Sequence, residues 1–166
     1  DIGHRPQWPN WMLEQLTALI NKYEAELIVI PGQHDLPQHN LGLYKKSGVG
    51  VLAQAGIIKL GGIYNLNRVY EYHFPITASK MLPKIIPFAF GHPLKKIAFE
   101  KYTQPNQYLV AMTHQLVINS RPDWPGQAAD LAMPLLKQFP EYRLILSGDN
   151  HKPFTKSFDG RLLVNP

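Results

Sequence analysis

Polar side chains of metal-binding type follow three apolar runs of the sequence. The run LIVI (27–30) leads into PGQHD, the run YLVAM (108–112) leads into THQ, and the run LIL (144–146) leads into SGDNH. Each run has the length and the aliphatic content of a buried strand, so its polar successors should lie in a loop at the carboxyl end of that strand. Open α/β sheets bind their ligands at this edge.

Gathered at one edge, these loops would supply oxygen and imidazole groups that suit one or two divalent cations. Residues 1–4, DIGH, precede the first predicted helix as another strand-end loop would. The chain contains no cysteine, which excludes a thiolate site. Taken singly, each motif is an ordinary turn or a core histidine, and the prediction depends on their coincidence. The candidate residues are Asp1, Gln33, His34, Asp35, His114, Asp149 and His151.

The elements that must position these loops can be predicted from periodicity and turn signals. Strands are expected at 27–30, 57–60, 68–74, 108–112 and 143–146, and helices at 10–24, 41–46, 49–54 and 127–139. Residues 75–93 are expected to be irregular and rich in proline, interrupted by the apolar run 85–90. Residues 154–158 and 161–164 should form a closing hairpin around Asp159-Gly160. Strands that alternate with helices and then form hairpins predict an α/β sandwich with mixed sheets.

Length and composition limit the possible classes of protein. A chain of 166 residues is expected to be a single domain, 1–166, with a substantial core. No apolar stretch reaches the ~18 residues of a membrane span, and the N-terminus lacks the pattern of a signal peptide. We therefore expect a soluble, cytoplasmic protein without a membrane partner.

The net charge of +5 is concentrated in the middle of the chain. Between residues 68 and 101, six basic residues face only Glu71 and Glu100, and aromatic residues lie between them. Such a segment could bind a polyanion, and a solvated face of lysines is the alternative. The candidate nucleic-acid contacts are Arg68, Lys80, Lys84, Lys95, Lys96 and Lys101.

The order of the motifs resembles that of the calcineurin-like metallophosphoesterase superfamily. That family carries Asp-x-His, Gly-Asp, Gly-Asn-His-Asp/Glu, a lone His and Gly-His-x-His, each at a strand end. Asp1 would match the second motif, Gly32 to Asp35 the third, His114 the fourth and Gly148 to His151 the fifth. Within the superfamily, the run DIGHRPQW followed by a helix, a strand and GQHD looks most like SbcD-type DNA-repair exonucleases and their phage-encoded relatives.

The resemblance implies an αββα sandwich with mixed sheets and two divalent ions. Mn²⁺ is favoured, with Mg²⁺, Fe or Zn²⁺ as alternatives. Asp1 would bridge the ions, Gln33, His114 and Asp149 would complete one coordination shell, and His151 would bind the other ion. A hydroxide bridging the metals, about 3.5 to 4 Å apart, would attack phosphorus. His34 would assist the leaving oxygen, and Asp35 would orient its imidazole.

Three departures from the family pattern qualify this expectation. The chain begins at the second motif, so it lacks the first strand and its Asp-x-His, and it stops at Val-Asn-Pro; we expect a domain truncated at both ends and weak or no activity for these 166 residues. Gln33 replaces Asn, which changes the reach of the amide. Asp149 replaces an imidazole, which favours Mn²⁺ or Mg²⁺ over Zn²⁺.

These observations favour a two-metal phosphodiester hydrolase, in particular a DNA exonuclease or endonuclease. DNA would be the substrate, and an SMC-like ATPase subunit is a possible partner by family resemblance. Two alternatives stay open. Gln33 and Asp149 favour a binding scaffold of this fold that has weak or no catalysis. Within the enzymes, a protein phosphatase or a cyclic-nucleotide phosphodiesterase would not need the basic segment.

Overall fold

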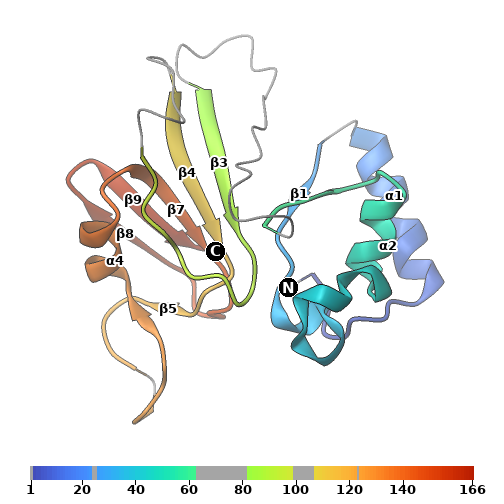
Figure 1. Cartoon of the computed structure of the whole chain (residues 1–166), viewed down its shortest axis with the longest axis horizontal. Coiled ribbons are helices and arrows are strands. Elements are labelled where there is room, and N and C mark those ends of the chain that lie inside the picture. The colour runs from blue at the N-terminus through green and yellow to red at the C-terminus, as the bar shows by residue number, and fades with distance from the viewer. Residues whose placement is uncertain (1, 24–25, 63–81, 99–106, 123) are drawn as a thin grey trace.

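A computed structural model describes residues 2–23, 26–62, 82–98, 107–122 and 124–166 of the chain. The central element is a five-stranded sheet in the order β3-β4-β7-β9-β8. All its neighbouring strands are parallel except β8 and β9, which are antiparallel. The chain is therefore a mixed α/β protein, as the sequence predicts (Figure 1). The strands are β3 (Leu82–Phe88), β4 (Gln107–Thr113), β7 (Tyr142–Ser147), β8 (Phe154–Phe158) and β9 (Arg161–Asn165).

A second group of elements, which contains α1, α2 and β1, lies to the right of the five-stranded sheet in Figure 1. It comprises α1 (Asn10–Tyr23), β1 (Ile28–Val29), η1 (Gln33–Asp35), η2 (Pro37–His39), η3 (Leu41–Lys46), α2 (Gly48–Gln54) and β2 (Lys59–Leu60). Strands β1 and β2 pair in parallel. The predicted helices at 10–24, 41–46 and 49–54 are confirmed, the second as a 3-10 helix. The side chain of Ser47 accepts from the N–H of Gly50 and caps α2.

Each of the two groups has its own hydrophobic cluster. In the first, α4 (Ala132–Gln138) packs Leu135 and Leu136 against one face of the five-stranded sheet, including Ile145 and Leu163. In the second, Trp8 and Val29 pack with α2, and one side of α1 lies over them. A backbone hydrogen bond joins the two groups: the carbonyl of Pro31, after β1, accepts from the N–H of Phe90, after β3.

The two predictions that the structure corrects both involve proline. Residues 82–88, expected to lie in irregular sequence, form β3. The carbonyl of Phe88 accepts from His114 on the β4 side, so Pro87 and Pro83, at odd offsets, turn their missing N–H away from β4. Proline is tolerated there because it removes no hydrogen bond from the ladder.

The helix expected at 127–139 begins only at Ala132. Pro134 fits the first turn of a helix, but its ring would clash with the carbonyl of Asp130 if the helix began earlier. Asp130 and Leu131 instead form β6, which pairs with β5 (Val117–Ile118).

Other predicted strands agree with the structure where it describes them. The runs at 27–30, 57–60, 108–112 and 143–146 contain β1, β2, β4 and β7. The hairpin β8–β9 turns at Asp159 and Gly160, which have φ of 52° and 72°, as a two-residue turn of the favoured hand requires. The expected strand at 68–74 lies outside the described residues. No helix in the described ranges is long and apolar enough to cross a membrane.

Candidate metal centre

The loop after β1 is shaped by the buried carboxylate of Asp35. Its Oδ2 accepts from the N–H of Gly32 at 3.1 Å, which closes the turn that carries Gln33 and His34. The same carboxylate accepts from the N–H of Ile2 at 3.1 Å and from that of Gly3 at 3.0 Å. Asp35 is 0% exposed, and charged acceptors of this kind form strong hydrogen bonds to backbone N–H groups. The loop thereby fixes the start of the chain beside η1.

His114 follows β4 and is only 6% exposed. Its Nε2 lies 2.6 Å from Oε1 of Gln33. Burial lowers the pKa of His114 from 6.5 to about 4, although the carboxylates of Asp149 and Asp35 oppose that shift. The imidazole is therefore neutral near pH 7, which is the protonation state that a metal-binding histidine needs.

Asp149 follows β7 and completes the cluster. The N–H of Gly148 donates to the carbonyl of Thr113 at 2.9 Å, which joins the loops after β4 and β7. Asp149 then adopts a φ of 77°, a left-handed conformation that Asp tolerates better than most residues. Its Oδ1 accepts from Nε2 of Gln33 at 2.6 Å and lies 3.7 Å from Nε2 of His114.

The fit of a divalent ion to this cluster can be judged from the spacing of its donor atoms. Ligands about 2.1 Å from a six-coordinate ion lie about 3 Å apart when they are neighbours in the shell. The separations of 2.6 Å and 3.7 Å around His114 Nε2 bracket that value. One imidazole, one carboxylate and one amide oxygen also form a suitable donor set. These residues would hold an ion only after Gln33 gives up its hydrogen bonds to His114 and Asp149, because its amide now bridges them.

The remaining candidates lie around this cluster or outside the described chain. Among the described residues, no group of three His, Cys, Asp or Glu side chains is close enough to hold a metal. His151 is exposed, and Asp1 falls outside the described residues. Their assignment as ligands stays a prediction.

His34 is exposed, and its ring lies edge to face with that of His39 at a centroid distance of 6.0 Å. His39 in turn places Nδ1 3.0 Å from the carbonyl of Gln33. No sequence pattern assigns a role to His39, which follows Gln38 in a left-handed turn with φ of 55° and 52° at the two residues. The predicted roles of His34 in catalysis and of Asp35 in orienting it stay predictions; the backbone contacts of Asp35 give it a structural role as well.

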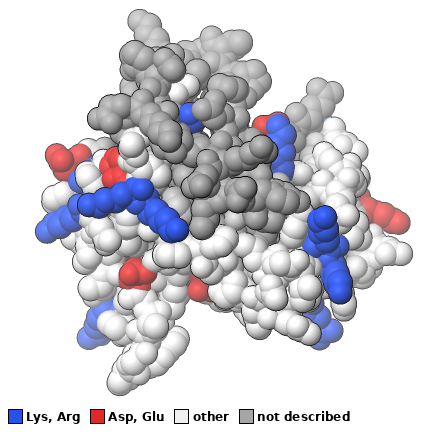
Figure 2. All heavy atoms as spheres, in the orientation of Figure 1, with Lys and Arg blue, Asp and Glu red and all other residues white. Residues whose placement is uncertain are grey.

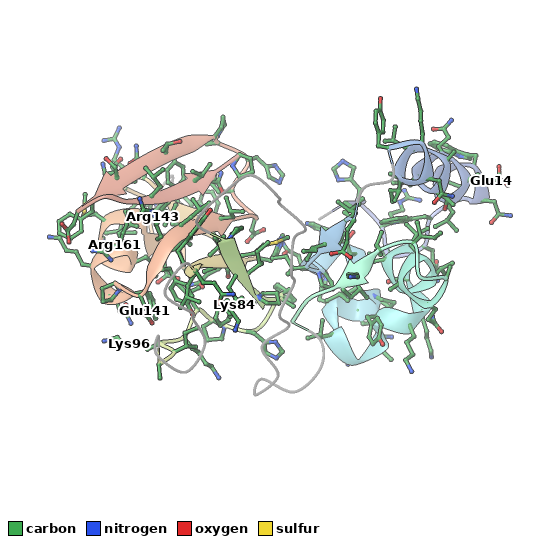
Figure 3. All side chains as sticks on the ribbon, turned by 90° about the horizontal axis from the view of Figure 1, so that it is seen from above. Glu14, Lys84, Lys96, Glu141, Arg143 and Arg161 are labelled. Atoms are coloured by element: carbon green, nitrogen blue, oxygen red, sulfur yellow. The ribbon has the colours of Figure 1, made fainter. Side chains whose placement is uncertain are left out.

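The basic residues of the middle segment do not share one environment. Lys84, on β3, is only 7% exposed, whereas Lys95 and Lys96 are exposed after the turn that follows β3. Figure 3 shows Lys84 and Lys96 on the part of the molecule that carries the five-stranded sheet. On the face of the molecule that Figure 1 presents, Figure 2 shows Lys and Arg in separate groups. The other candidates, Arg68, Lys80 and Lys101, lie outside the described residues.

An apolar cavity of about 490 Å³ adjoins the cluster. It lies between residues 27–30 of the β1 group and the ends of β4 and β7, and His114 is part of its wall. An apolar wall on one side lowers the local dielectric and strengthens electrostatic interactions at the cluster. It agrees with the burial that keeps His114 neutral.

Comparison with known proteins identifies the class. The family model for calcineurin-like phosphoesterases matches residues 1–153, and the chain belongs to this family. The family takes its name from phosphoester hydrolysis. The matched span includes all three clustered residues.

Comparison with solved structures supports the fold. A protein of known crystal structure matches 94% of this chain with a TM-score of 0.52 and 14% sequence identity. The chain spans 64% of the length of that protein. No curated protein sequence matches the chain.

Proposed function

We propose that this protein is a metal-dependent phosphodiesterase that acts on DNA, of the SbcD type. The observation that carries the hydrolytic part is the convergence of Gln33, His114 and Asp149 from three strand-end loops, with the imidazole held neutral. Family membership supports the reaction class. The DNA preference rests on the basic segment and on the sequence resemblance.

The residues of the chain divide the work in this proposal. Gln33, His114 and Asp149 bind one divalent ion, Mn²⁺ by preference, and Asp1 and His151 contribute to a two-ion centre. Bound ions supply Lewis-acid charge at the phosphoryl oxygens and make water a better nucleophile. His34, exposed beside the cluster, gives a proton to the leaving oxygen. Lys95 and Lys96 neutralise backbone phosphates.

The test is hydrolysis by the full-length protein with Mn²⁺. Single-stranded DNA, double-stranded DNA and bis-p-nitrophenyl phosphate are compared as substrates. We expect all activity to fall at least 100-fold in Asp149→Ala and to persist in Glu14→Gln, a carboxyl change at an exposed position of α1, at the edge of the molecule in Figure 3. Activity on the small ester alone would remove the nuclease part and leave a phosphatase or cyclic-nucleotide phosphodiesterase.

The binding-scaffold alternative rests on the direct hydrogen bond between Gln33 and Asp149. In a scaffold, this bond would persist and fewer than one metal ion would bind per chain. Metal analysis of the purified full-length protein therefore separates the two functions. One or two Mn²⁺ ions per chain, together with turnover of any phosphodiester, exclude the scaffold.

A further inference from the structure

A row of three buried polar side chains crosses the sheet just below the metal centre. Thr113, Ser147 and Asn165 end the neighbouring strands β4, β7 and β9, and they are 1%, 3% and 1% exposed. Thr113 pairs with Ser147, and Asn165 follows directly on the pair of Leu146 with Val164. Polar groups buried this deeply in an apolar sheet need hydrogen-bond partners or a functional reason.

Asn165 has such partners, and all of them lie between Ser147 and Lys152, in the segment that carries Asp149. Its Nδ2 donates to the carbonyl of Asn150 at 2.7 Å and to that of Lys152 at 3.0 Å. Its Oδ1 accepts from Oγ of Ser147 at 3.2 Å. Both amide hydrogens are thus used. The opposite amide orientation would place an oxygen against two carbonyl oxygens, so the network defines which way the amide points.

The loop between β7 and β8 is tied down on both sides of Asp149. On one side, the N–H of Gly148 donates to Thr113. On the other, Nδ2 of Asn150 donates to the carbonyl of Val117 at 2.7 Å, and Asn165 binds the carbonyls of Asn150 and Lys152. These anchors hold Asp149 at a φ of 77°, where its carboxylate meets Gln33 and His114.

From this network we infer that Asn165 is a positioning residue of the metal centre: its side-chain amide holds the 148–152 loop so that the carboxylate of Asp149 faces Gln33 and His114. This inference deepens the proposed function and rests on it for its metal-binding consequence. The loop geometry itself depends only on the contacts above. A supporting group that orients a ligand in this way is typically worth a factor of about 10 to 100 in metal affinity.

The test uses Asn165→Asp in the full-length protein, with Thr113→Val as the matched control. The Asp variant keeps size and the acceptor for Ser147, but it turns an oxygen toward the two loop carbonyls. Thr113 is equally buried in the same row, and its hydroxyl has no hydrogen-bond partner among the described residues. Removing that hydroxyl should therefore leave the loop in place.

Two readouts are needed. The first is the position of the His114 ring signals in the NMR spectrum of the metal-free protein. The second is the dissociation constant for Mn²⁺ at low temperature, far below the melting point. We expect Asn165→Asp to shift the ring signals and weaken Mn²⁺ binding about 10- to 100-fold, and Thr113→Val to change neither. Ser147→Ala, which removes only the partner of Oδ1, should produce a smaller change in the same direction.

The outcomes distinguish this inference from the proposed function. A lower melting temperature for Asn165→Asp and Ser147→Ala with unchanged His114 signals and Mn²⁺ affinity would show a purely structural role and overturn the inference. If the wild-type protein bound no Mn²⁺, the proposed metal-binding function would be wrong. The shift of the His114 signals would still decide the positioning role.

Discussion

The imidazole Nε2 of His114 lies 2.6 Å from the amide oxygen of Gln33, although 81 positions separate the two residues in sequence. An amide oxygen only accepts, so the neutral imidazole carries its proton on Nε2 in this state. A metal ion at Nε2 requires that proton to move to Nδ1 and the amide of Gln33 to turn. We expect Zn²⁺, a diamagnetic probe, to move the proton to Nδ1, as ¹H–¹⁵N spectra of the ring would show. An unchanged tautomer at saturating Zn²⁺ would place the ion elsewhere.

Gln33→Ala should destabilise the metal-free protein by about 1 to 3 kcal/mol. The change leaves the buried N–H of His114 and the carboxylate of Asp149 without the amide that joins them. Urea denaturation measures the loss. Gln15→Ala, on exposed α1, is the control and should stay within about 0.5 kcal/mol of the wild type. Equal effects of the two changes would contradict the joining role of Gln33.

The low pKa of His114 makes the folded protein less stable in acid. The folded-state pKa of about 4 lies below the ordinary 6.5, so between these values the unfolded chain binds more protons than the folded one. Stability should therefore rise from pH 4 to pH 6.5, with up to about 3 kcal/mol from this residue. Urea denaturation across this range, compared with His114→Gln, isolates the contribution. The variant should show a flatter profile, and an identical profile would remove His114 as the cause.

Asp149→His should keep the fold and change the metal preference. Histidine, like Asp, is found more often than most residues at the positive φ that this position requires. An added imidazole favours Zn²⁺ relative to Mn²⁺. Competition between the two ions, followed by metal analysis, measures the preference. Recovery of a second bound ion instead would mean that Asp149 marks a site that has lost one metal.

Asp35→Asn should loosen the start of the chain. The carboxylate accepts from the N–H groups of Ile2, Gly3 and Gly32, and an Asn amide offers only one oxygen to them. We expect faster hydrogen exchange at Gly3 and Gly32 and a stability loss of about 1 to 3 kcal/mol. Unchanged exchange at both amides, with a loss of activity alone, would favour the orienting of His34 as the main role of Asp35.

The exposed pair Lys95 and Lys96 offers a direct test of DNA binding. Replacing both with alanine should weaken DNA affinity and reduce the dependence of log Kd on log salt by about one unit for each lost phosphate contact. Lys45 and Lys46 form a matched control, because they are also adjacent and exposed. Fluorescence anisotropy at several salt concentrations gives both quantities. Equal losses from the two pairs would indicate general charge attraction without a defined DNA surface.

Local patterns were sufficient to predict most of the elements. The apolar runs at 108–112 and 143–146 lie in β4 and β7, and Asp159-Gly160 forms the turn of the closing hairpin. The failures at β3 and at the start of α4 both involve proline: at α4 the ring of Pro134 excludes an earlier start, and at β3 the effect depends on the direction of the missing N–H. That direction depends on which strand lies alongside, and the sequence does not contain this information.

By itself, the sequence determined which loops carry polar residues and that three of them follow buried strands. Only the tertiary structure decided that Gln33, His114 and Asp149 come together. It also placed Lys84 among the buried residues and Asn165 under the loop of Asp149. The physical reason is the range of the interactions, because strand and turn preferences act over a few residues. The distances in the site depend on how parallel strands far apart in the chain pair and pack.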